Sequence, residues 1–376
     1  MVIIMSNIHK KFTILLLSAP IGAGHRLAAE GLQEYLQKNP QVEVIHGNIF
    51  DFFPHCLGQG FLKAYLWILG HCPWLYELAY KWGNQERGSL WMRNLINGLL
   101  ALLGKSYLRQ IQPDAVLATH ATPVGIMSIY KKKYQPHLYL GAVITDFTIH
   151  RWWICPRVNT YFLADAALQQ LLPQEAASLA TGIPLRQAFT QYTREQVRQE
   201  YQWQEQEKIC LLMGGGEGLL PMEEIIAALL QLQHSQLKLV VITGNNEELA
   251  QQLRQEYGPT IAVYGFIDFV PKLMLGADML ISKAGGLTAA EALATGLELF
   301  IYKPLPGQES KNASFLAANY GAHIVNSPQE IKEGVGQLLT TAGPGEKSRQ
   351  AQEAKKHAAA SICKQVLKEL DEQSFT

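Results

Sequence analysis

The sequence has no excess of charge of either sign and no long apolar run. Lys and Arg together number 32, as do Asp and Glu, so the formal net charge is zero. The molecule as a whole therefore has no electrostatic attraction to nucleic acid or to anionic lipid, although local patches can exist. We expect no nucleic-acid partner. No segment reaches the about 18 uninterrupted apolar residues needed to cross a bilayer, so no membrane-spanning helix is expected.

The cysteine content excludes further classes of protein. The five cysteines are odd in number and none has Cys-x-x-Cys spacing, which argues against a disulfide framework and a zinc ribbon. Reduced, buried thiols in a cytosolic protein are the prediction. No cluster that would coordinate a nucleotide-bound metal is visible, so we expect neither a metal nor an organic cofactor. Lys10 and Lys11 before apolar residues mimic a signal peptide, but a glycine turn follows, which favours a buried first strand.

Length and pattern predict two α/β domains. The chain has 376 residues, 48% of them hydrophobic and 17% charged, which suits two domains of roughly 150 to 200 residues. Short apolar strands alternate with longer helical patterns, as is typical of parallel sheets with crossover helices. The predicted strands are 14–17, 115–118, 138–145, 160–164, 209–212, 237–243, 261–264, 279–282 and 299–302.

The domain boundary is predicted near residue 180, where a charged, glutamine-rich helix follows a strand pattern. In open parallel sheets, ligands bind beyond the carboxyl ends of the strands, so two such sheets predict one cleft between the domains. The predicted parts are an N-terminal domain at 1–180 with an insertion at about 52–108, a C-terminal domain at 181–350, and a last helix at about 351–376 that packs back on the first domain.

The first of two glycine-rich turns carries a histidine. It runs from Ser18 to His25 and contains Gly22 and Gly24. No Lys-Ser or Lys-Thr pair follows, so it is not a P-loop, and Leu27 stands where a dinucleotide fingerprint has its third glycine. A histidine at this helix start can reach a ligand hydroxyl, and the positive helix end would lower its pKa toward that of a neutral base. A histidine that merely caps the turn is the alternative.

A more specific pattern lies at 265–292. It combines Phe266 at a strand end, a glycine-rich helix start at 286–288 and Glu291 farther along that helix. These parts match a nucleoside diphosphate, because the ring can flank a base, the helix start can meet phosphates and the carboxylate can accept two ribose hydroxyl protons. A buried structural glutamate is the alternative.

Two further segments offer polar groups but are weak signals alone. The second glycine turn has free N–H groups that suit a phosphate or hydroxyl, although such turns also occur for tight packing. A polar loop after residue 302 suits the vicinal hydroxyls of a sugar, and a solvated loop would explain it equally well. The residues concerned are Gly214, Gly215 and Gly216 in the turn and Gln308, Glu309 and Asn312 in the loop.

The segment 52–108 departs from the α/β pattern. It is dense in aromatic and aliphatic residues, and its charges are mostly basic. Trp and Tyr suit the headgroup boundary of a membrane. A helical insertion packed on the first domain and a membrane-contacting surface both remain open. The residues predicted to contact a membrane are Trp67, Trp74, Tyr76, Trp82 and Trp91.

Five motifs spread along nearly the whole chain match one known family. They are Ser-x-x-x-Gly-x-Gly-His at 18–25, Thr-Asp-Phe at 145–147 with His150 and Trp153, Gly-Ile-Pro at 182–184 with Arg186, a lysine-glycine-glycine motif at 283–288, and Gly-Gln-Glu at 307–309. Together they resemble the monogalactosyldiacylglycerol synthase and processive diacylglycerol glucosyltransferase group. That group is related to the transferase that adds N-acetylglucosamine to lipid I. Both belong to glycosyltransferase family 28, whose GT-B fold has two Rossmann-like doubly wound domains facing a cleft.

The resemblance implies roles for individual residues. His25 would be the acceptor-activating base, with Gly24, His120, Asp146 and His150 on the acceptor side. Uracil, diphosphate, ribose and hexose would be held by the C-terminal domain. The implied donor-binding residues are Arg186, Gly214, Gly215, Gly216, Phe266, Ile267, Lys283, Gly286, Leu287, Thr288, Glu291, Gln308, Glu309 and Asn312.

The predicted activity is an inverting transfer of a hexose from a UDP-sugar, as co-substrate, to the hydroxyl of 1,2-diacylglycerol. The enzyme is expected to be cytoplasmic and peripherally associated with the inner face of the plasma membrane. Transfer to a polyprenyl-linked or other lipid acceptor is an alternative. A non-catalytic UDP-sugar-sensing protein and a UDP-sugar epimerase are alternatives of other classes. The sequence does not distinguish glucose, galactose and N-acetylglucosamine, and it does not predict the oligomeric state.

Overall fold

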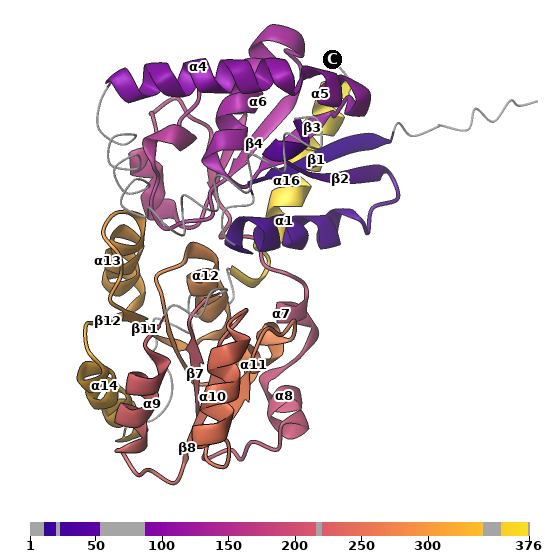
Figure 1. Cartoon of the computed structure of the whole chain (residues 1–376). Coiled ribbons are helices and arrows are strands. Elements are labelled where there is room, and N and C mark those ends of the chain that lie inside the picture. Colours follow the sequence, from indigo (N-terminus) through magenta and orange to yellow (C-terminus); the bar gives the residue numbers. More distant parts are fainter. Residues whose placement is uncertain (1–10, 20–22, 53–86, 216–219, 341–354, 375–376) are drawn as a thin grey trace, which may run out of the picture.

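The computed structural model describes residues 11–19, 23–52, 87–215, 220–340 and 355–374. Within these residues the chain forms two parallel sheets with helices on both faces, one above the other in Figure 1. The predicted α/β class with two doubly wound domains is therefore confirmed.

The N-terminal sheet has the strand order β2-β1-β3-β4-β5-β6, and its pairs are parallel. Its strands are β1 (Phe12–Ser18), β2 (Val42–Asn48), β3 (Ala115–Ala118), β4 (Tyr139–Val143), β5 (Thr160–Leu163) and β6 (Ser178–Ala180). The helices around it are α1 (Ala23–Leu36), α4 (Arg87–Leu103), α5 (Lys105–Ile111) and α6 (Ala121–Tyr134), with short 3-10 turns η1 (Ile49–Phe52), η2 (Arg151–Trp153) and η3 (Ala166–Leu171).

The C-terminal sheet repeats this plan with the order β12-β11-β10-β7-β8-β9. Its strands are β7 (Lys208–Met213), β8 (Leu237–Ile242), β9 (Ala262–Tyr264), β10 (Met279–Ser282), β11 (Glu298–Tyr302) and β12 (His323–Val325). Its helices are α7 (Ala188–Gln191), α8 (Arg194–Glu200), α9 (Met222–Leu230), α10 (Glu247–Tyr257), α11 (Val270–Gly276), α12 (Gly286–Thr295), α13 (Gln308–Tyr320) and α14 (Pro328–Thr340).

The sequence patterns did not single out β2 or β12, and they indicated β6 only as a strand pattern that ends at 182–184. All three lie at an edge of their sheet, and each is only partly buried. An edge strand needs less apolar surface than a central strand, which is covered on both faces. The central strand β1 is instead covered on both faces. Ile14 and Leu16 pack into one core, and Leu15 and Leu17 pack into another.

Each sheet reverses its strand order at one point. In the N-terminal sheet the chain goes from β1 outward to β2 and then returns to β3 on the other side of β1. In the C-terminal sheet the same reversal separates β7 from β10. In open α/β sheets, ligands bind beyond the carboxyl ends of the strands at such a switch point. The glycine turn with His25 and the lysine-glycine-glycine motif at 283–288 thus each follow a strand next to a switch point.

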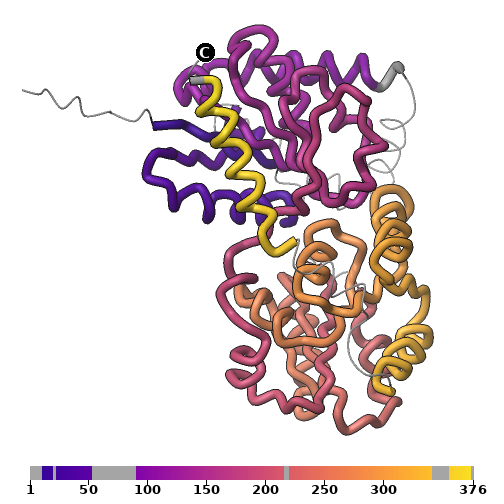
Figure 2. Tube along the Cα trace, turned by 180° about the vertical axis from the view of Figure 1, so that it is seen from behind, coloured from indigo at the N-terminus to yellow at the C-terminus, as the bar shows by residue number. Residues whose placement is uncertain are grey.

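The last helix, α16 (Ala358–Ser374), belongs to the N-terminal core although it ends the chain. Figure 2 shows it in yellow, lying across the back of the N-terminal domain. Ile362, Val366 and Leu370 are buried in one cluster with residues of α1 and β1. The described chain therefore runs between the two domains twice, once before β7 and once before α16.

A buried lysine connects these two crossings. Lys355 Nζ donates to the Tyr320 hydroxyl at 2.6 Å and lies 3.9 Å from Asp165 Oδ2. The Tyr320 hydroxyl also donates to Asp165. Burial lowers the pKa of Lys355 to about 8, against the opposing effect of Asp165. The three side chains come from the C-terminal segment, α13 and the N-terminal domain, and Gly182 lies against Lys355.

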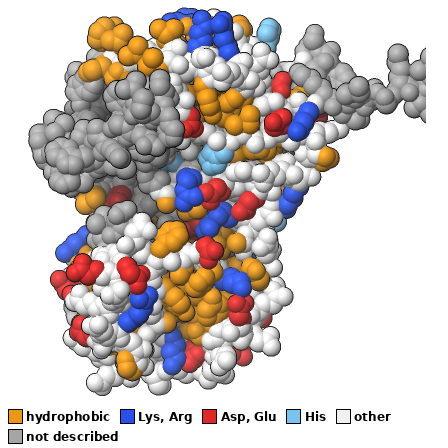
Figure 3. Space-filling model, turned by 45° about the vertical axis from the view of Figure 1, so that its right-hand side comes forward, with side chains coloured by type: hydrophobic (Ala, Val, Ile, Leu, Met, Phe, Trp, Pro, Cys, Tyr) orange, Lys and Arg blue, Asp and Glu red, His pale blue; other side chains and the backbone are white. Residues whose placement is uncertain are grey.

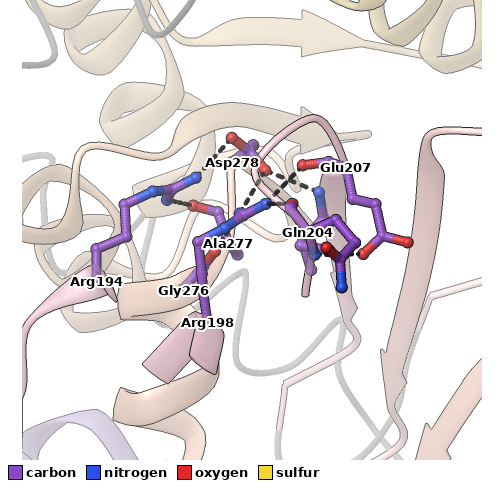
Figure 4. A network of polar contacts seen from close by, with 8 residues as sticks. Arg194, Arg198, Gln204, Glu207, Gly276, Ala277 and Asp278 are labelled. Carbon is purple, nitrogen blue, oxygen red and sulfur yellow. Dashed lines mark hydrogen bonds and ion pairs between the residues drawn. The ribbon is translucent and has the colours of Figure 1, made fainter. Parts of the chain in front are cut away.

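A second polar network fixes the helix that follows the first crossing (Figure 4). The guanidinium of Arg198 in α8 donates to the carbonyl oxygens of Gly276 at 2.9 Å and Glu207 at 2.8 Å. Arg194 pairs with Asp278 at 2.7 Å, and Asp278 also accepts from the Ile209 amide at 2.8 Å. Arg198 is 8% exposed, so its charge depends on these partners. The network attaches α8 to the starts of β7 and β10.

We predict that Arg198→Met lowers the free energy of unfolding by about 3 to 5 kcal/mol, because the carbonyl oxygens of Gly276 and Glu207 lose their charged donor and Asp278 loses one of its cationic partners. Methionine keeps most of the apolar stem, so the loss would report the charge and its hydrogen bonds. The matched control is Arg254→Met, since Arg254 forms an exposed ion pair with Glu247 and should change stability by about 1 kcal/mol at most. Urea denaturation measures both, and equal effects of the two substitutions would contradict the prediction.

Candidate active site

The N-terminal half of the site is built around His25, in the first turn of α1. Its Nδ1 lies 2.8 Å from the Thr119 carbonyl oxygen and 2.8 Å from Thr145 Oγ1. A carbonyl oxygen only accepts hydrogen bonds, so the Nδ1 of His25 carries the proton and donates it. The neutral ring then has its lone pair on Nε2. This is the tautomer required of a general base that acts through Nε2.

The pKa of His25 is lowered from its ordinary value, so the neutral form is favoured. Burial is the main cause, and Asp146 and the hydrogen bond to Thr119 oppose it. The direction matches the sequence prediction, but the predicted cause was the helix end rather than burial.

His120 and His150 have the opposite tautomer. His120 Nδ1 accepts from the Thr122 amide at 3.2 Å, and His150 Nδ1 accepts from the Trp152 amide at 3.1 Å. Each of these histidines caps the turn that follows it. Because Nδ1 accepts, the neutral ring carries its proton on Nε2 and offers a donor there. Burial and the neighbouring histidines hold the pKa of His120 well below its ordinary value.

These acceptor-side residues lie together. The rings of His25 and His120 meet edge to face with centroids 4.8 Å apart. Asp146 is 6% exposed and close enough to His25 to raise its pKa, and His150 is close enough to His120 to lower the pKa of that ring. The structure thus places one potential base and two neutral donors in the segments that follow the carboxyl ends of β1, β3 and β4. Gly24 faces the other domain, because a Cβ there would lie 3.4 Å from the Leu287 Cβ.

The C-terminal half begins at the start of α12. A Cβ on Gly286 would lie 2.0 Å from the Thr145 carbonyl oxygen, so only glycine fits this contact between the domains. Lys283 precedes the helix and is partly buried, and Thr288 lies in its first turn. The first turn of α12 has no acidic residue and no side-chain cap. Its N–H groups and positive end suit an anionic group.

Glu291 lies in the second turn of α12 and is 5% exposed. Burial raises the pKa of this carboxyl to about 7, and the positive charge of Arg186 opposes the rise. The Nε of Arg186 is itself buried and has no hydrogen-bond partner among the described residues. Two of the predicted donor-binding residues are therefore close enough to interact electrostatically in the described structure.

The remaining donor-side residues are placed as follows. Gly214 and Gly215 follow β7, and Gly215 has a φ of 76°, which favours glycine. Phe266 follows β9 with 69% of its surface exposed, while Ile267 packs against the core. Gln308 and Glu309 begin α13. Glu309 Oε2 accepts a hydrogen bond from the Leu305 amide at 3.0 Å, so this carboxylate also stabilises the loop that precedes α13.

Several predicted residues have a different or undescribed environment. Asn312 is buried with its side-chain amide bonded to Asp146, Phe147 and Ala284, so it lies between the domains rather than on the open loop that its sequence suggested. Its role in donor binding stays a prediction. The residues that lie outside the described part of the chain are Gly216, Trp67, Trp74, Tyr76 and Trp82. Trp91 is described and is 69% exposed.

Sequence reasoning gave no role to two threonines that hold His25. Thr119 follows β3, and Thr145 follows β4, each at the carboxyl end of its strand. Thr119 also donates from its hydroxyl to the His25 carbonyl at 3.0 Å. Ligands bind beyond the strand ends of open α/β sheets, so the position of these threonines at strand ends was a signal that the sequence offered. Their contacts with His25 could be predicted only once the order of the strands was known.

Comparison with known proteins shows which family the chain resembles. A family model for monogalactosyldiacylglycerol (MGDG) synthase matches residues 25–184, and one for the glycosyltransferase family 28 C-terminal domain matches residues 209–369. These matches confirm the resemblance to the monogalactosyldiacylglycerol synthase group of family 28 glycosyltransferases. A similar curated relative of this glycosyltransferase is the processive diacylglycerol beta-glucosyltransferase of Bacillus pumilus (strain SAFR-032), which is 28% identical over 97% of this chain and 96% of the relative.

Solved structures share the fold of this glycosyltransferase. MurG of Acinetobacter baumannii has a TM-score of 0.60 at 16% identity and covers 95% of this chain and 99% of its own. The glycosyltransferase of kitacinnamycin has a TM-score of 0.65 at 13% identity, over 96% and 100% of the two chains. The GT-B fold predicted from the motifs is confirmed.

Among the residues that the structure describes, no helix combines the length and apolar character of a membrane span. In the same residues, no group of three or more His, Cys, Asp or Glu side chains is arranged to hold a metal ion.

The raised pKa of Glu291 predicts a pH dependence of stability. Because its folded pKa of about 7 lies above its value in the unfolded chain, the folded state binds this proton more tightly, and the resulting stabilisation is full below about pH 4.5 and lost as pH rises through 7. Relative to Glu291→Gln, the wild type should lose unfolding free energy between about pH 5 and pH 8. Urea denaturation at several pH values measures the difference.

The matched control for this experiment is Glu224→Gln, at an exposed position of α9, which should follow the wild-type pH dependence. If the unfolding free energy of Glu291→Gln also changes with pH as that of the wild type does, the assignment of a proton to Glu291 near neutral pH is wrong.

Proposed function

We propose that this glycosyltransferase moves a hexose from a UDP-sugar to the free hydroxyl of diacylglycerol, with inversion at the anomeric carbon. The observation that carries the proposal is the contact between the start of α12 and the loop that holds His25. His25, with its lone pair on Nε2, follows β1, and the start of α12 meets, through Gly286, the loop after β4 whose Thr145 hydroxyl contacts His25. The family-model match and the name of the Bacillus relative, a diacylglycerol beta-glucosyltransferase, support the acceptor.

In the proposed reaction His25 removes the proton from the acceptor hydroxyl. The new alkoxide oxygen attacks the anomeric carbon from the side opposite the diphosphate, so the carbon–oxygen bond to UDP breaks as the new glycosidic bond forms. The proton rests on His25 Nε2, and the negative charge moves to the leaving diphosphate. The start of α12 and Lys283 would stabilise that charge. His120 and His150, as neutral Nε2–H donors, would hold the acceptor without competing for its proton.

Glu291 is proposed to accept hydrogen bonds from the ribose hydroxyls. Only the ionised carboxylate accepts with both oxygens. The opposing charge of Arg186 keeps the pKa of Glu291 from rising further than about 7. Gln308 and Glu309, at the start of α13, are proposed to contact the hexose, and the exposed ring of Phe266 is proposed to flank the uracil. No resident cofactor or metal is part of this proposal.

We also propose that α4 docks this enzyme on a membrane. The helix exposes apolar residues along one face, namely Trp91, Leu95, Leu99 and Leu102, which are 69%, 59%, 58% and 55% exposed. Its buried face instead holds polar residues: Arg93, 7% exposed, donates to two backbone carbonyls, and Asn97 is 3% exposed. A helix with buried polar residues and a row of exposed apolar residues suggests an apolar partner.

The charge around α4 favours an anionic lipid surface. Helices α4, α5 and α6 contain seven Lys and Arg residues and no Asp or Glu. In Figure 3, apolar side chains gather at the top of the N-terminal domain with Lys and Arg side chains beside them. A basic, apolar surface binds anionic bilayers through both burial and electrostatic attraction. The inner face of the plasma membrane is the location that we propose.

The base assignment predicts that His25→Ala lowers turnover by about 100- to 10,000-fold, since a positioned base contributes that much to proton transfer. UDP affinity, measured by calorimetry, should stay within about threefold of wild type because the donor site is left intact. The control is His137→Ala at an exposed position of the N-terminal domain. Turnover of His25→Ala close to that of the control would remove the base assignment.

The docking proposal predicts that Trp91→Ser with Leu95→Ser reduces co-flotation with vesicles of anionic phospholipid several-fold, because the apolar area that enters the interface is smaller. A matched pair, Leu171→Ser with Leu179→Ser, removes apolar residues that are 46% and 39% exposed elsewhere on the same domain. This control should float like the wild type. Flotation of the α4 variant at the wild-type level would show that α4 is not the docking surface.

A further inference from the structure

The Asn312 side chain joins helix α13 and the segment before α12, in the C-terminal domain, to the 145–147 loop of the N-terminal domain. It is 1% exposed, in the second turn of α13. Its Oδ1 accepts from the Phe147 amide at 3.0 Å, and its Nδ2 donates to Asp146 Oδ1 at 3.1 Å and to the Ala284 carbonyl at 3.1 Å. Both amide hydrogens and the amide oxygen are therefore used.

The loop that Asn312 holds is also fixed from a second direction. The backbone of Gly286 packs against the Thr145 carbonyl so closely that a Cβ would lie 2.0 Å from that oxygen. Asp146 is thus held between the α12 start and the Asn312 amide. Farther along the loop, Phe147 packs its ring against Phe315 at 5.8 Å between centroids.

This loop in turn orients His25. Thr145 Oγ1 lies 2.8 Å from His25 Nδ1 and 3.3 Å from the Thr119 carbonyl, which the same nitrogen contacts. Asp146, the next residue, acts electrostatically on the His25 ring. One turn of α13 separates Asn312 from Gln308, and Ala284 comes just before α12. The described contacts run without a gap from the two donor-side helix starts to the imidazole.

We propose that Asn312 is a positioning residue that ties the starts of α12 and α13 to the 145–147 loop and so aligns His25 with the donor. The proposal rests on the proposed function, in which the diphosphate binds at α12 and the hexose at α13. A donor that settles on these two helix starts then also sets the loop that holds the base. The base is aligned when the donor half is docked on the acceptor half, which favours transfer to the lipid hydroxyl over premature loss of the sugar.

The test compares Asn312→Ala, which removes all three hydrogen bonds, with Asn312→Asp, which keeps the Oδ1 acceptor but opposes a carboxylate oxygen to Asp146 and the Ala284 carbonyl. Asn319→Ala is the control, because Asn319 lies on the same helix with an exposed side chain that bonds only within α13. The Cε1–H resonance of His25, assigned with His25→Gln, is titrated by NMR with and without UDP. Turnover on lipid vesicles and UDP affinity are measured on the same samples.

We expect both Asn312 variants to lower kcat by about 10- to 100-fold with UDP affinity kept within about threefold, since misplacement of a catalytic group costs that much. The pKa of His25 should fall further in Asn312→Ala, because Asp146, which opposes its lowering, is released. The control should match the wild type in every readout. A purely structural role would lower the melting temperature and leave the His25 titration unchanged.

Two results would overturn the proposal. One is an unchanged His25 titration with wild-type kcat in Asn312→Ala. The other is a loss of UDP affinity with the His25 titration unchanged, which would make Asn312 a donor contact instead. If the wild type transfers no sugar from any UDP-sugar to lipid, the proposed function fails, and the titration of His25 still decides whether Asn312 acts on it.

Discussion

The contact on which the site depends is the packing of the Gly286 backbone against the Thr145 carbonyl. It brings the start of α12 to within van der Waals distance of the loop that carries Asp146. Any side chain at position 286 would force the two loops apart, and with them the two switch points. Each half of the site is then a standard feature of a doubly wound sheet, and the chemistry arises where the two halves meet.

The histidines show how backbone contacts divide the chemical roles. His25 donates a hydrogen bond from Nδ1 to a carbonyl oxygen and has its lone pair on Nε2. His120 and His150 instead accept hydrogen bonds from amides at Nδ1 and have their protons on Nε2. Burial keeps both His25 and His120 in the neutral form. Three identical side chains in one region therefore present one ring nitrogen that can accept a proton and two N–H donors, because each lies at a different point of its strand end or helix start.

Much of the fold was predictable, because central parallel strands are continuous apolar runs, as in β3 and β10. The edge strands β2 and β12 were not, and β6 was indicated only as a strand pattern without bounds, since these strands are only partly buried and depend on tertiary neighbours. Glycine turns and strand ends pointed to His25, Gly286 and Glu291. The roles of Thr145 and Asn312 depend on contacts with residues more than a hundred positions away, and that of Lys355 on a contact several tens of positions away. Local sequence patterns carry no information about such pairs.

The central claim is that one interface joins a lipid hydroxyl to a sugar nucleotide. The most direct measurement is a matrix of UDP-glucose, UDP-galactose and UDP-N-acetylglucosamine against vesicles with diacylglycerol, a polyprenyl phosphate lipid or neither, with products identified by mass spectrometry and anomeric configuration by NMR. We expect diacylglycerol that carries one added sugar in the inverted configuration, and no such product from His25→Ala. Product on the polyprenyl lipid alone, or consumption of no donor with any lipid, would contradict the claim.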